Sequence, residues 1–455
     1  MWMFLDIFDH LVYYLMEMFG ILFSTFVVEP FQCFRSIYFT DLLLFFFPAL
    51  VIDMPRYILS DIAVLIREWF FLPDYESTDF AKRLRGPNPP FLSVLMPGLN
   101  EGETVGKTIA SFLESGYPNM EIIVVSDGST DDMNEICRNY ERQGKIRFFV
   151  HRERCGKSAA ANFALKMARG EFVLHADADT TFDRDAIYRI LLPFADPHVG
   201  AVSGNLRVRN WSHNLITRFQ ALEYLFSIGV GRRFSSMLNI LAIISGAFGA
   251  FRRQVLVDVG GWDTGPGEDA DVTIKFRKAG YKIAFAADAI CQTNVPTTWK
   301  RYWKQRLRWN RSLIRYRWRK HRNIYTDWKQ FDRGSLVGMA DSFFFQGLMP
   351  LLRVPYFLVV ASFWFKQSNI IIAGTFYFYT LSNIIQYIII LILSERPRQD
   401  LKLWWAVPLM TFFRLYETMD RIYACLDELF FETSFTDPYV PPRVQKKLDR
   451  VWHTD

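Results

Sequence analysis

Hydrophobic and polar positions divide the chain into two ends with long apolar runs and a centre in which short apolar runs alternate with amphipathic stretches. In the centre, apolar runs of the length typical of buried strands occur at residues 92–97, 121–126, 146–150 and 172–176. Helical periodicity fills the intervals between them, at residues 104–115, 131–143 and 158–168. Repeated β-α units of this length predict an α/β fold with a mostly parallel sheet and right-handed crossovers.

The remainder of the centre follows a less regular pattern. We expect residues 185–239 to be mostly helical, because they carry an apolar stripe. Residues 240–253 are rich in small residues, and the glycines among them would permit close backbone approach. A glycine-rich loop then opens a helix that ends near Ala279. Residues 299–322 predict another helix, since neither Gly nor Pro interrupts them.

The apolar amino-terminal part predicts contact with a membrane. Residues 37–59 are long and apolar enough to span a bilayer, whereas residues 11–28 either span it or lie in its surface. Residues 61–71 have the pattern of an interfacial helix. No cleavable signal peptide is expected, because the first residues lack a basic region.

The carboxyl-terminal part predicts two further spans, at 343–364 and 370–393. The basic loop at 393–404 is expected on the cytoplasmic side by the positive-inside rule. Residues 404–430 are either a third span that faces protein or an interfacial helix, and the basic tail favours the interfacial helix. The expected regions are a membrane region at 1–72, a cytosolic domain at 73–298, basic interfacial helices at 299–335, and a second membrane region at 336–455.

Composition supports a soluble domain between two membrane-associated ends. Aromatic residues make up 17% of the chain, with 43 Phe, and they concentrate in its two ends. The five cysteines show no metal-ligand spacing, so we expect reduced thiols in a cytosolic domain. The formal net charge is only +6, although residues 299–322 hold a dense cluster of Lys and Arg.

Acidic residues follow three of the predicted strands. Glu101, Asp127, and Asp177 with Asp179 come directly after apolar runs. The carboxyl ends of parallel strands share one edge of a sheet, where ligands of α/β folds bind, so these acids should line one crevice. Two carboxylates at the spacing of Asp177 and Asp179 can face one hard cation, Mg²⁺ or Mn²⁺. The alternative is an acidic polar loop without a metal.

Two further clusters have both a functional and a structural interpretation. Glu268 and Asp269 stand where a glycine-rich loop meets a helix, and N-capping alone would explain them. Gln305, Arg308 and Trp309 share one face of the basic helix and would suit a ligand that is both phosphorylated and sugar-like, unless their spacing is a coincidence. The basic helix itself has three possible interpretations: it binds nucleic acid, it is a solvated surface helix, or it lies along the cytoplasmic face of a membrane. Its position just before the apolar carboxyl-terminal part favours the membrane.

Taken in order, short motifs resemble those of the family 2 glycosyltransferases, specifically the membrane-embedded cellulose, hyaluronan, chitin-oligosaccharide and poly-N-acetylglucosamine synthases. The motifs are PGLNE (97–101), SDGS (126–129), GK (156–157), DAD (177–179), SGAFGAF (245–251), GED (267–269) and QRLRW (305–309). The resemblance covers residues 90–315 by motif. Leu99 and Gly267 depart from the usual cellulose synthase pattern, which makes cellulose a less secure product.

The resemblance implies a GT-A (Rossmann-like) cytosolic domain that uses a nucleotide-diphosphate sugar and Mg²⁺ or Mn²⁺. The residues that it assigns to the UDP-sugar are Glu101, Asp127, Lys157, Asp177, Gln305 and Arg308. It assigns the metal to Asp177 and Asp179, general-base catalysis to Asp269 with Glu268 beside it, and the acceptor to Trp309, Ser245 and Gly246.

These residues support a hypothesis about the reaction. A metal and Arg308 would neutralise the departing diphosphate, while one base would activate the acceptor hydroxyl, so that a single displacement inverts the anomeric carbon. We expect an inverting processive β-glycosyltransferase that makes an exopolysaccharide from a UDP-sugar and translocates it. The alternatives are a non-processive enzyme with a ceramide or polyprenyl-phosphate acceptor and, more remotely, an inactive membrane subunit or transporter.

The same hypothesis makes statements about partners and location. The expected partners are the UDP-sugar, the growing polysaccharide, the lipid bilayer and accessory export or regulatory subunits, with no nucleic acid. The protein is expected to be integral to the plasma (inner) membrane, with its catalytic domain in the cytoplasm.

Overall fold

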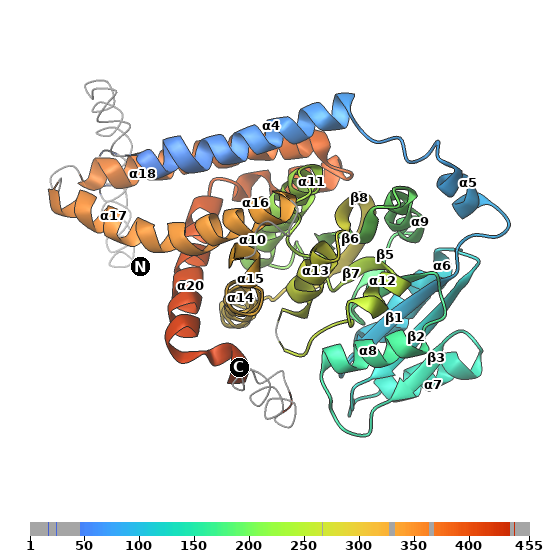
Figure 1. Ribbon diagram of the computed structural model, residues 1–455. Coiled ribbons are helices and arrows are strands. Elements are labelled where there is room, and N and C mark those ends of the chain that lie inside the picture. Colours follow the sequence, from blue (N-terminus) through green and yellow to red (C-terminus); the bar gives the residue numbers. More distant parts are fainter. Residues whose placement is uncertain are drawn as a thin grey trace, which may run out of the picture.

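The computed structural model describes residues 46–265, 267–326, 333–363 and 368–436, together with residues 17, 24 and 441 (Figure 1). Its centre is an 8-stranded sheet in the order β3-β2-β1-β4-β7-β6-β8-β5. The strands are β1 Leu92–Gly98, β2 Met120–Ser126, β3 Arg147–Val150, β4 Phe172–Ala176, β5 Thr181–Phe182, β6 Val199–Val208, β7 Phe248–Arg252 and β8 Lys282–Thr293. Strands β1 to β4 are parallel to one another, which confirms the predicted β-α units, whereas β7 is antiparallel to both β4 and β6.

Helices cover both faces of the parallel half of the sheet. The crossovers contain α6 Gly102–Glu114, α7 Met133–Arg142 and α8 Lys157–Met167, close to the predicted bounds. On β1, Val94 and Met96 belong to one apolar cluster, and Leu95 belongs to a second cluster. Alternate side chains of a strand point to opposite faces, so both faces of the sheet are buried. This burial explains why these strands appear as continuous apolar runs in the sequence.

Residues 185–239 are mostly helical, as expected, but they also contain strand β6, which the sequence pattern did not predict. All residues of β6 are buried, and the strand pairs with both β7 and β8. Its glycines admit large neighbours: a Cβ at Gly200 would lie 2.7 Å from the Cβ of Tyr281, and one at Gly204 would lie 2.0 Å from a ring carbon of Phe248. Packing against distant residues, rather than local apolar content, therefore defines this strand.

Near the amino terminus, one continuous helix replaces the two predicted segments. The π-helical turn η2 Pro48–Asp53 leads directly into α4 Met54–Phe70. No Gly or Pro falls between Arg56 and Leu72, so nothing in the sequence breaks this helix between 59 and 61. The predicted segment at 11–28 and the first half of 37–59 lie outside the described residues, apart from residues 17 and 24.

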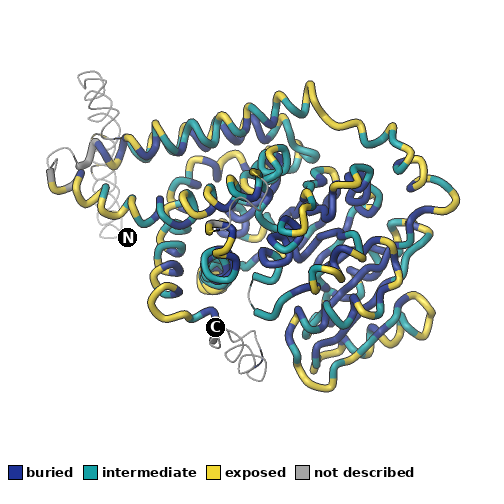
Figure 2. The backbone as a smooth tube through the Cα atoms, viewed as in Figure 1, coloured by how far each residue is buried: buried dark blue, intermediate teal, exposed yellow. Residues whose placement is uncertain are grey.

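Among the residues that the structure describes, two helices are long and apolar enough to cross a membrane, Arg333–Val360 and Ile371–Leu393. They contain most of the predicted spans at 343–364 and 370–393. The first comprises α16 Arg333–Asp341, η7 Ser342–Leu348 and most of α17 Met349–Phe363, and the second belongs to α18 Ser368–Leu393. Figure 2 shows exposed residues along α17, and Ile372, Tyr377 and Ile388 of α18 are exposed as well.

Helix α20 Met410–Phe431 has two contrasting faces. Phe412, Leu415 and Met419 are exposed at helical spacing. On the other face, Glu417 accepts a hydrogen bond of 2.8 Å from the hydroxyl of Tyr302 in α14 Trp299–Leu313. An exposed apolar stripe opposite a packed polar face favours the interfacial alternative for this segment.

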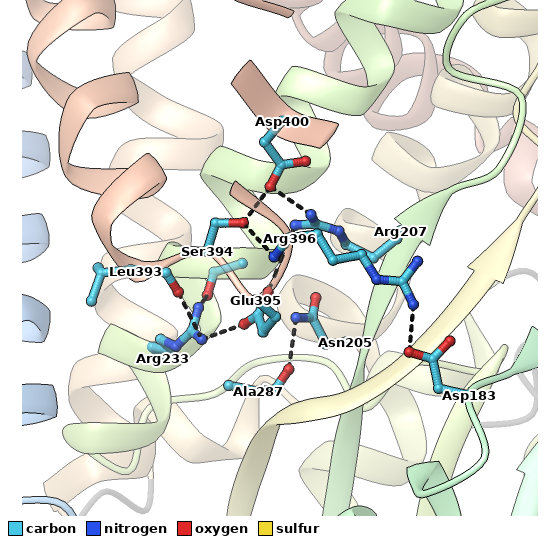
Figure 3. Close-up of polar contacts among 11 residues, drawn as sticks. Asp183, Asn205, Arg207, Arg233, Ala287, Leu393, Ser394, Glu395, Arg396 and Asp400 are labelled. Atoms are coloured by element: carbon cyan, nitrogen blue, oxygen red, sulfur yellow. Dashed lines mark hydrogen bonds and ion pairs between the residues drawn. The ribbon is translucent and has the colours of Figure 1, made fainter. Parts of the chain in front are cut away.

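The segment after α18 is docked on the sheet domain (Figure 3). Three arginine–carboxylate pairs make this contact: Arg207 of β6 with Asp400, Arg233 of α11 Arg232–Met237 with Glu395, and Arg396 with Asp183. The Arg207 Nη2 and Asp400 Oδ2 atoms are 2.5 Å apart, and both side chains are buried. The loop that was predicted to be cytoplasmic therefore lies on the same side as the sheet domain.

Candidate active site

The predicted acids that follow β1 and β4 gather at the carboxyl edge of the parallel strands. Glu101 stands before α6, and Asp177 and Asp179 come directly after β4. Burial raises the pKa of Glu101, and the negative charges of Asp179 and Asp177 add to this effect. Burial and the charge of Asp177 likewise raise the pKa of Asp179. The negative charges of these carboxylates therefore act on one another at this edge of the sheet, in agreement with the crevice hypothesis.

Lys157 connects the two acidic motifs. It is the first residue of α8 and follows Gly156, whose φ of 94° is a conformation that favours glycine. Its Nζ lies 2.6 Å from Oδ1 of Asp177 and 3.7 Å from Oε1 of Glu268. Although burial opposes it, the charges of Asp177 and Glu268 raise the pKa of Lys157. The amine therefore stays protonated in the middle of the acidic cluster.

The side chain of Asp269 bonds to a separate segment rather than capping its own helix. Asp269 is the second residue of α13 Glu268–Lys278, and its Oδ2 accepts a hydrogen bond of 3.0 Å from the N–H of Gly246. A Cβ at Gly246 would lie 2.5 Å from Oδ1 of Asp269, so only glycine permits this approach. Burial raises the pKa of Asp269 to about 7, and Glu268 contributes to the shift. A carboxyl group with this pKa can exchange a proton near neutral pH.

The predicted acceptor residues Ser245 and Gly246 lie beside this carboxylate. The N–H of Ser245 donates to Oγ of Ser203 in β6 at 3.1 Å. The same Oγ accepts from Nη1 of Arg232 at 2.8 Å. Burial lowers the pKa of Arg232 to about 10, while the charge of Asp269 opposes that shift. The strand that sequence analysis missed thus fixes the turn that contacts Asp269.

Asp127 occupies the neighbouring part of the same edge. Its Oδ1 accepts from the N–H of Cys155 at 2.8 Å and lies 3.0 Å from Nδ1 of His151, while Oδ2 accepts from the N–H of Gly156 at 2.7 Å. Gly156 precedes Lys157, so the chain joins the predicted nucleotide contact directly to the acidic cluster.

Two groups of side chains have the chemistry of metal ligands. Potential ligand atoms of Asp127, His151 and Cys155 lie within 4.8 Å of one another, and this set of oxygen, nitrogen and sulfur suits a softer ion such as Zn²⁺. Asp177 and Asp179 offer oxygen atoms only, which Mg²⁺ and Mn²⁺ prefer. A divalent cation between them would also relieve the repulsion that raises the pKa of Asp179. The residues therefore fit the predicted metal.

Helix α14 carries Gln305, Arg308 and Trp309 and packs next to the loop that leads into α13. A Cβ at Gly267 would lie 2.5 Å from Cβ of Ser312, one turn beyond Trp309. The Trp309 side chain is 38% exposed. These contacts place α14, whose residues are predicted to bind the donor and the acceptor sugar, next to the acidic cluster. That Gln305, Arg308 and Trp309 contact the substrate stays a prediction.

Arg306 holds Trp309 and α10 Leu215–Tyr224 together. Its Nη2 lies 2.5 Å from Oε2 of Glu223, and its guanidinium lies 4.4 Å from the centroid of a Trp309 ring. Arg311 and Arg319 of the basic segment pair with Asp427 and Glu428 of α20. These three arginines therefore pack the basic segment against the rest of the protein, whereas Lys300, Arg301 and Lys304 of the same segment are exposed.

Four residues at or next to the site are not among the predicted site residues. They are His151, His175, Ser203 and Arg232. His175 was visible as a polar residue in an apolar strand, and burial lowers its pKa to about 4. The others lie outside the quoted motifs, and only their tertiary contacts identify them.

Comparisons with known proteins agree with this geometry. A family model described as "Glycosyltransferase like family 2" matches residues 89–312. A poly-beta-1,6-N-acetyl-D-glucosamine synthase of Staphylococcus epidermidis is 38% identical over 220 residues, which are 48% of this chain and 53% of the relative. One of Staphylococcus aureus (strain COL) is 37% identical over 220 residues, with the same coverage. The chain therefore spans about half the length of these curated relatives.

A solved structure shows the same fold. It is a mannosyltransferase of Pyrobaculum calidifontis in complex with GDP-Man and Mn²⁺, with a TM-score of 0.50 and 21% identity. The match covers 82% of this chain and 99% of the mannosyltransferase. Residues 89–312 are therefore similar to a glycosyltransferase family 2 domain, and this part of the chain has the GT-A fold.

Proposed function

We propose that this protein is an inverting β-glycosyltransferase that polymerises N-acetylglucosamine from its UDP-sugar into an extracellular polysaccharide. The observation that carries the proposal is the half-buried Asp269 carboxylate, which accepts a hydrogen bond from Gly246 and whose pKa is raised to about 7 beside the cluster of Lys157 and Asp177. The choice of sugar and of a β-1,6 linkage rests on the names of the Staphylococcus relatives. Asp269 accepts the proton of the acceptor hydroxyl as that hydroxyl attacks the anomeric carbon.

The other residues of the cluster bind and orient the donor. Asp127 contacts the nucleotide, and Lys157 and Arg308 place positive charge beside the diphosphate. A divalent cation held by Asp177 and Asp179 would supply Lewis-acid neutralisation of the leaving group. Trp309 offers a flat apolar face to the acceptor sugar. Because one base and one displacement suffice, an α-linked donor yields a β-linked product.

Processive synthesis and export form the second part of the proposal. Two helices that are long and apolar enough to cross a bilayer follow the catalytic domain directly, and α20 presents an apolar stripe. This arrangement supports an integral protein of the plasma membrane with a cytoplasmic active site, which receives the donor and passes the polymer outward. Accessory export or regulatory subunits remain a prediction.

The experiment offers single radiolabelled UDP-sugars with Mg²⁺ or Mn²⁺ to membranes that contain the protein, followed by product sizing and digestion with linkage-specific glycanases. We expect long products from UDP-N-acetylglucosamine alone, even when acceptor is scarce. Label recovered entirely in single-sugar lipids after chloroform–methanol extraction would instead establish the lipid-acceptor alternative. An absence of transfer from every donor would support the inactive subunit.

A variant pair tests the acceptor platform. Trp309→Ala should lose transfer to glycan acceptors far more than it loses UDP affinity, because its ring contacts sugar and not nucleotide. Trp299→Ala is the matched control, since Trp299 lies on the same helix but packs against Tyr416 of α20 at a ring-centroid distance of 5.0 Å. Equal losses in the two variants would show that the effect comes from helix packing.

A further inference from the structure

A buried histidine of β4 reaches the turn that holds Asp269. His175 is 2% exposed and lies two residues before Asp177. Its Nδ1 makes a short hydrogen bond with the carbonyl oxygen of Gly246. A carbonyl oxygen only accepts hydrogen bonds, so Nδ1 carries the proton and donates it. The ring also packs against Trp262 at a centroid distance of 5.0 Å, which holds its orientation.

Gly246 is therefore held from two sides. Its carbonyl oxygen accepts from His175, and its N–H donates to Oδ2 of Asp269 at 3.0 Å. Its Cα lies so close to the carboxylate that an added Cβ would be 2.5 Å from Oδ1. The turn from Ser245 to Phe248 has its own hydrogen bond, from the N–H of Phe248 to the oxygen of Ser245 at 3.2 Å. A displacement of Gly246 would thus move the hydrogen-bond donor of Asp269.

We propose that His175 is a positioning residue which, through Gly246, orients the carboxylate of Asp269 toward the acceptor hydroxyl. This inference rests on the proposed function, in which Asp269 is the base. His175 does not exchange a proton with substrate. It fixes the backbone that donates to Asp269, in the way that outer hydrogen bonds fix a catalytic group in its productive geometry.

The charged surroundings of both groups are the same cluster. Lys157, Asp177 and Glu268 act on His175, and Glu268, Lys157, Asp177 and Arg232 act on Asp269. Loss of His175 leaves these charges in place and removes the restraint on Gly246 together with the ring contact to Trp262. The ionised form of Asp269 then loses a hydrogen-bond donor, so the pKa of Asp269 rises further. Asp127, the predicted nucleotide contact, is held by other backbone groups and keeps its geometry.

The test compares His175→Leu with His175→Asn, whose amide can still donate to the Gly246 carbonyl. In the full-length protein in membranes, His175→Leu should lower kcat about tenfold at pH 7, shift the acid limb of the rate profile upward by about one pH unit, and leave the Kd for UDP within about twofold. His175→Asn should recover most of kcat and return the limb toward its original position. His198→Leu, at an exposed histidine, is the control that should change nothing.

The outcomes separate this inference from the proposed function. A fall in kcat with no shift of the limb and no recovery in His175→Asn overturns the positioning role, as does an unchanged kcat in His175→Leu. If His175→Leu does not fold, His175→Phe takes its place, because it keeps a planar ring against Trp262 and lacks the N–H donor, and an unshifted limb in that variant rejects the positioning role. If Asp269→Asn retains turnover, Asp269 is not the base and the proposed function is rejected, whatever the result for the His175 variants.

Discussion

At Asp269, several neighbours act on one carboxyl group. Burial and the charge of Glu268 oppose ionisation, whereas Lys157 and the Gly246 N–H favour it, and the resulting pKa is about 7. An isolated aspartate would be fully ionised at neutral pH and a weaker base. The environment thus gives this residue a basicity that matches proton transfer under physiological conditions.

Asp269 should control the pH dependence of transfer. A base must be ionised, so kcat/KM should fall about tenfold for each pH unit below about 7. Glu268→Gln removes a negative neighbour, which lowers the pKa of Asp269 and should move this limb to lower pH. Asp269→Asn should lose turnover by about 10²-fold or more while UDP binding by calorimetry stays near normal. Loss of donor affinity with retained turnover would reassign Asp269 to binding.

Removal of the metal should stop the reaction. Asp177 and Asp179 are the proposed ligands, so EDTA should abolish sugar transfer, and Mg²⁺ or Mn²⁺ should restore it. Asp179→Asn should be inactive although the folded protein still reaches the membrane. Asp185→Asn is the control, because that side chain is 57% exposed and pairs with Arg189. Full activity in EDTA would exclude a metal role for this pair of aspartates.

Among the helices and strands, those whose pattern is visible in a short stretch of sequence could be predicted. Strands β1, β2 and β4 are buried on both faces, so each is a continuous apolar run between turn residues, and the loops that follow them carry the acids of the motifs. Strand β6 contains Ser203, Asn205 and Arg207, and its strand form depends on pairing with β7 and β8. Such partners are remote in sequence, so neither β6 nor the roles of Ser203 and His175 could be predicted from local patterns.

The contact between Arg396 and Asp183 joins the membrane helices to the metal motif, because Asp183 follows Asp179 by four residues. Arg396→Asp should place two like charges together and lower both the unfolding temperature and transfer activity. Arg396→Asp combined with Asp183→Arg should restore most of both, with a coupling free energy of about 1–3 kcal/mol from the double-mutant cycle. Arg398→Asp, at an exposed position of the same loop, is the matched control. An additive cycle would show that this pair does not couple the two parts.

At the scale of the whole molecule, polar contacts tie the membrane-associated helices together. Asp53, at the start of the α4 helix, accepts hydrogen bonds from Arg353 of α17 at 2.6 Å and from Tyr379 of α18. Phe46, Val360 and Ile371 pack together near this end. The opposite end of α18 leads into the loop that is docked on the sheet domain. The helices therefore have one end beside the catalytic domain and one end away from it (Figure 1).

This polarity predicts the topology of the protein in a membrane. The sheet domain, the 394–400 loop and the basic helix α14 should face the cytoplasm, where UDP-sugars are made and where basic loops are retained. The connection between α17 and α18 should face outward. In a background without native cysteines, a membrane-impermeant maleimide added to intact cells should label Asn369→Cys but not Gln143→Cys, which lies at an exposed position after α7. Permeabilised cells should label both variants, which controls for reactivity. Labelling of Gln143→Cys alone in intact cells would place the active site outside the cell, away from its donor, and would contradict synthesis coupled to export.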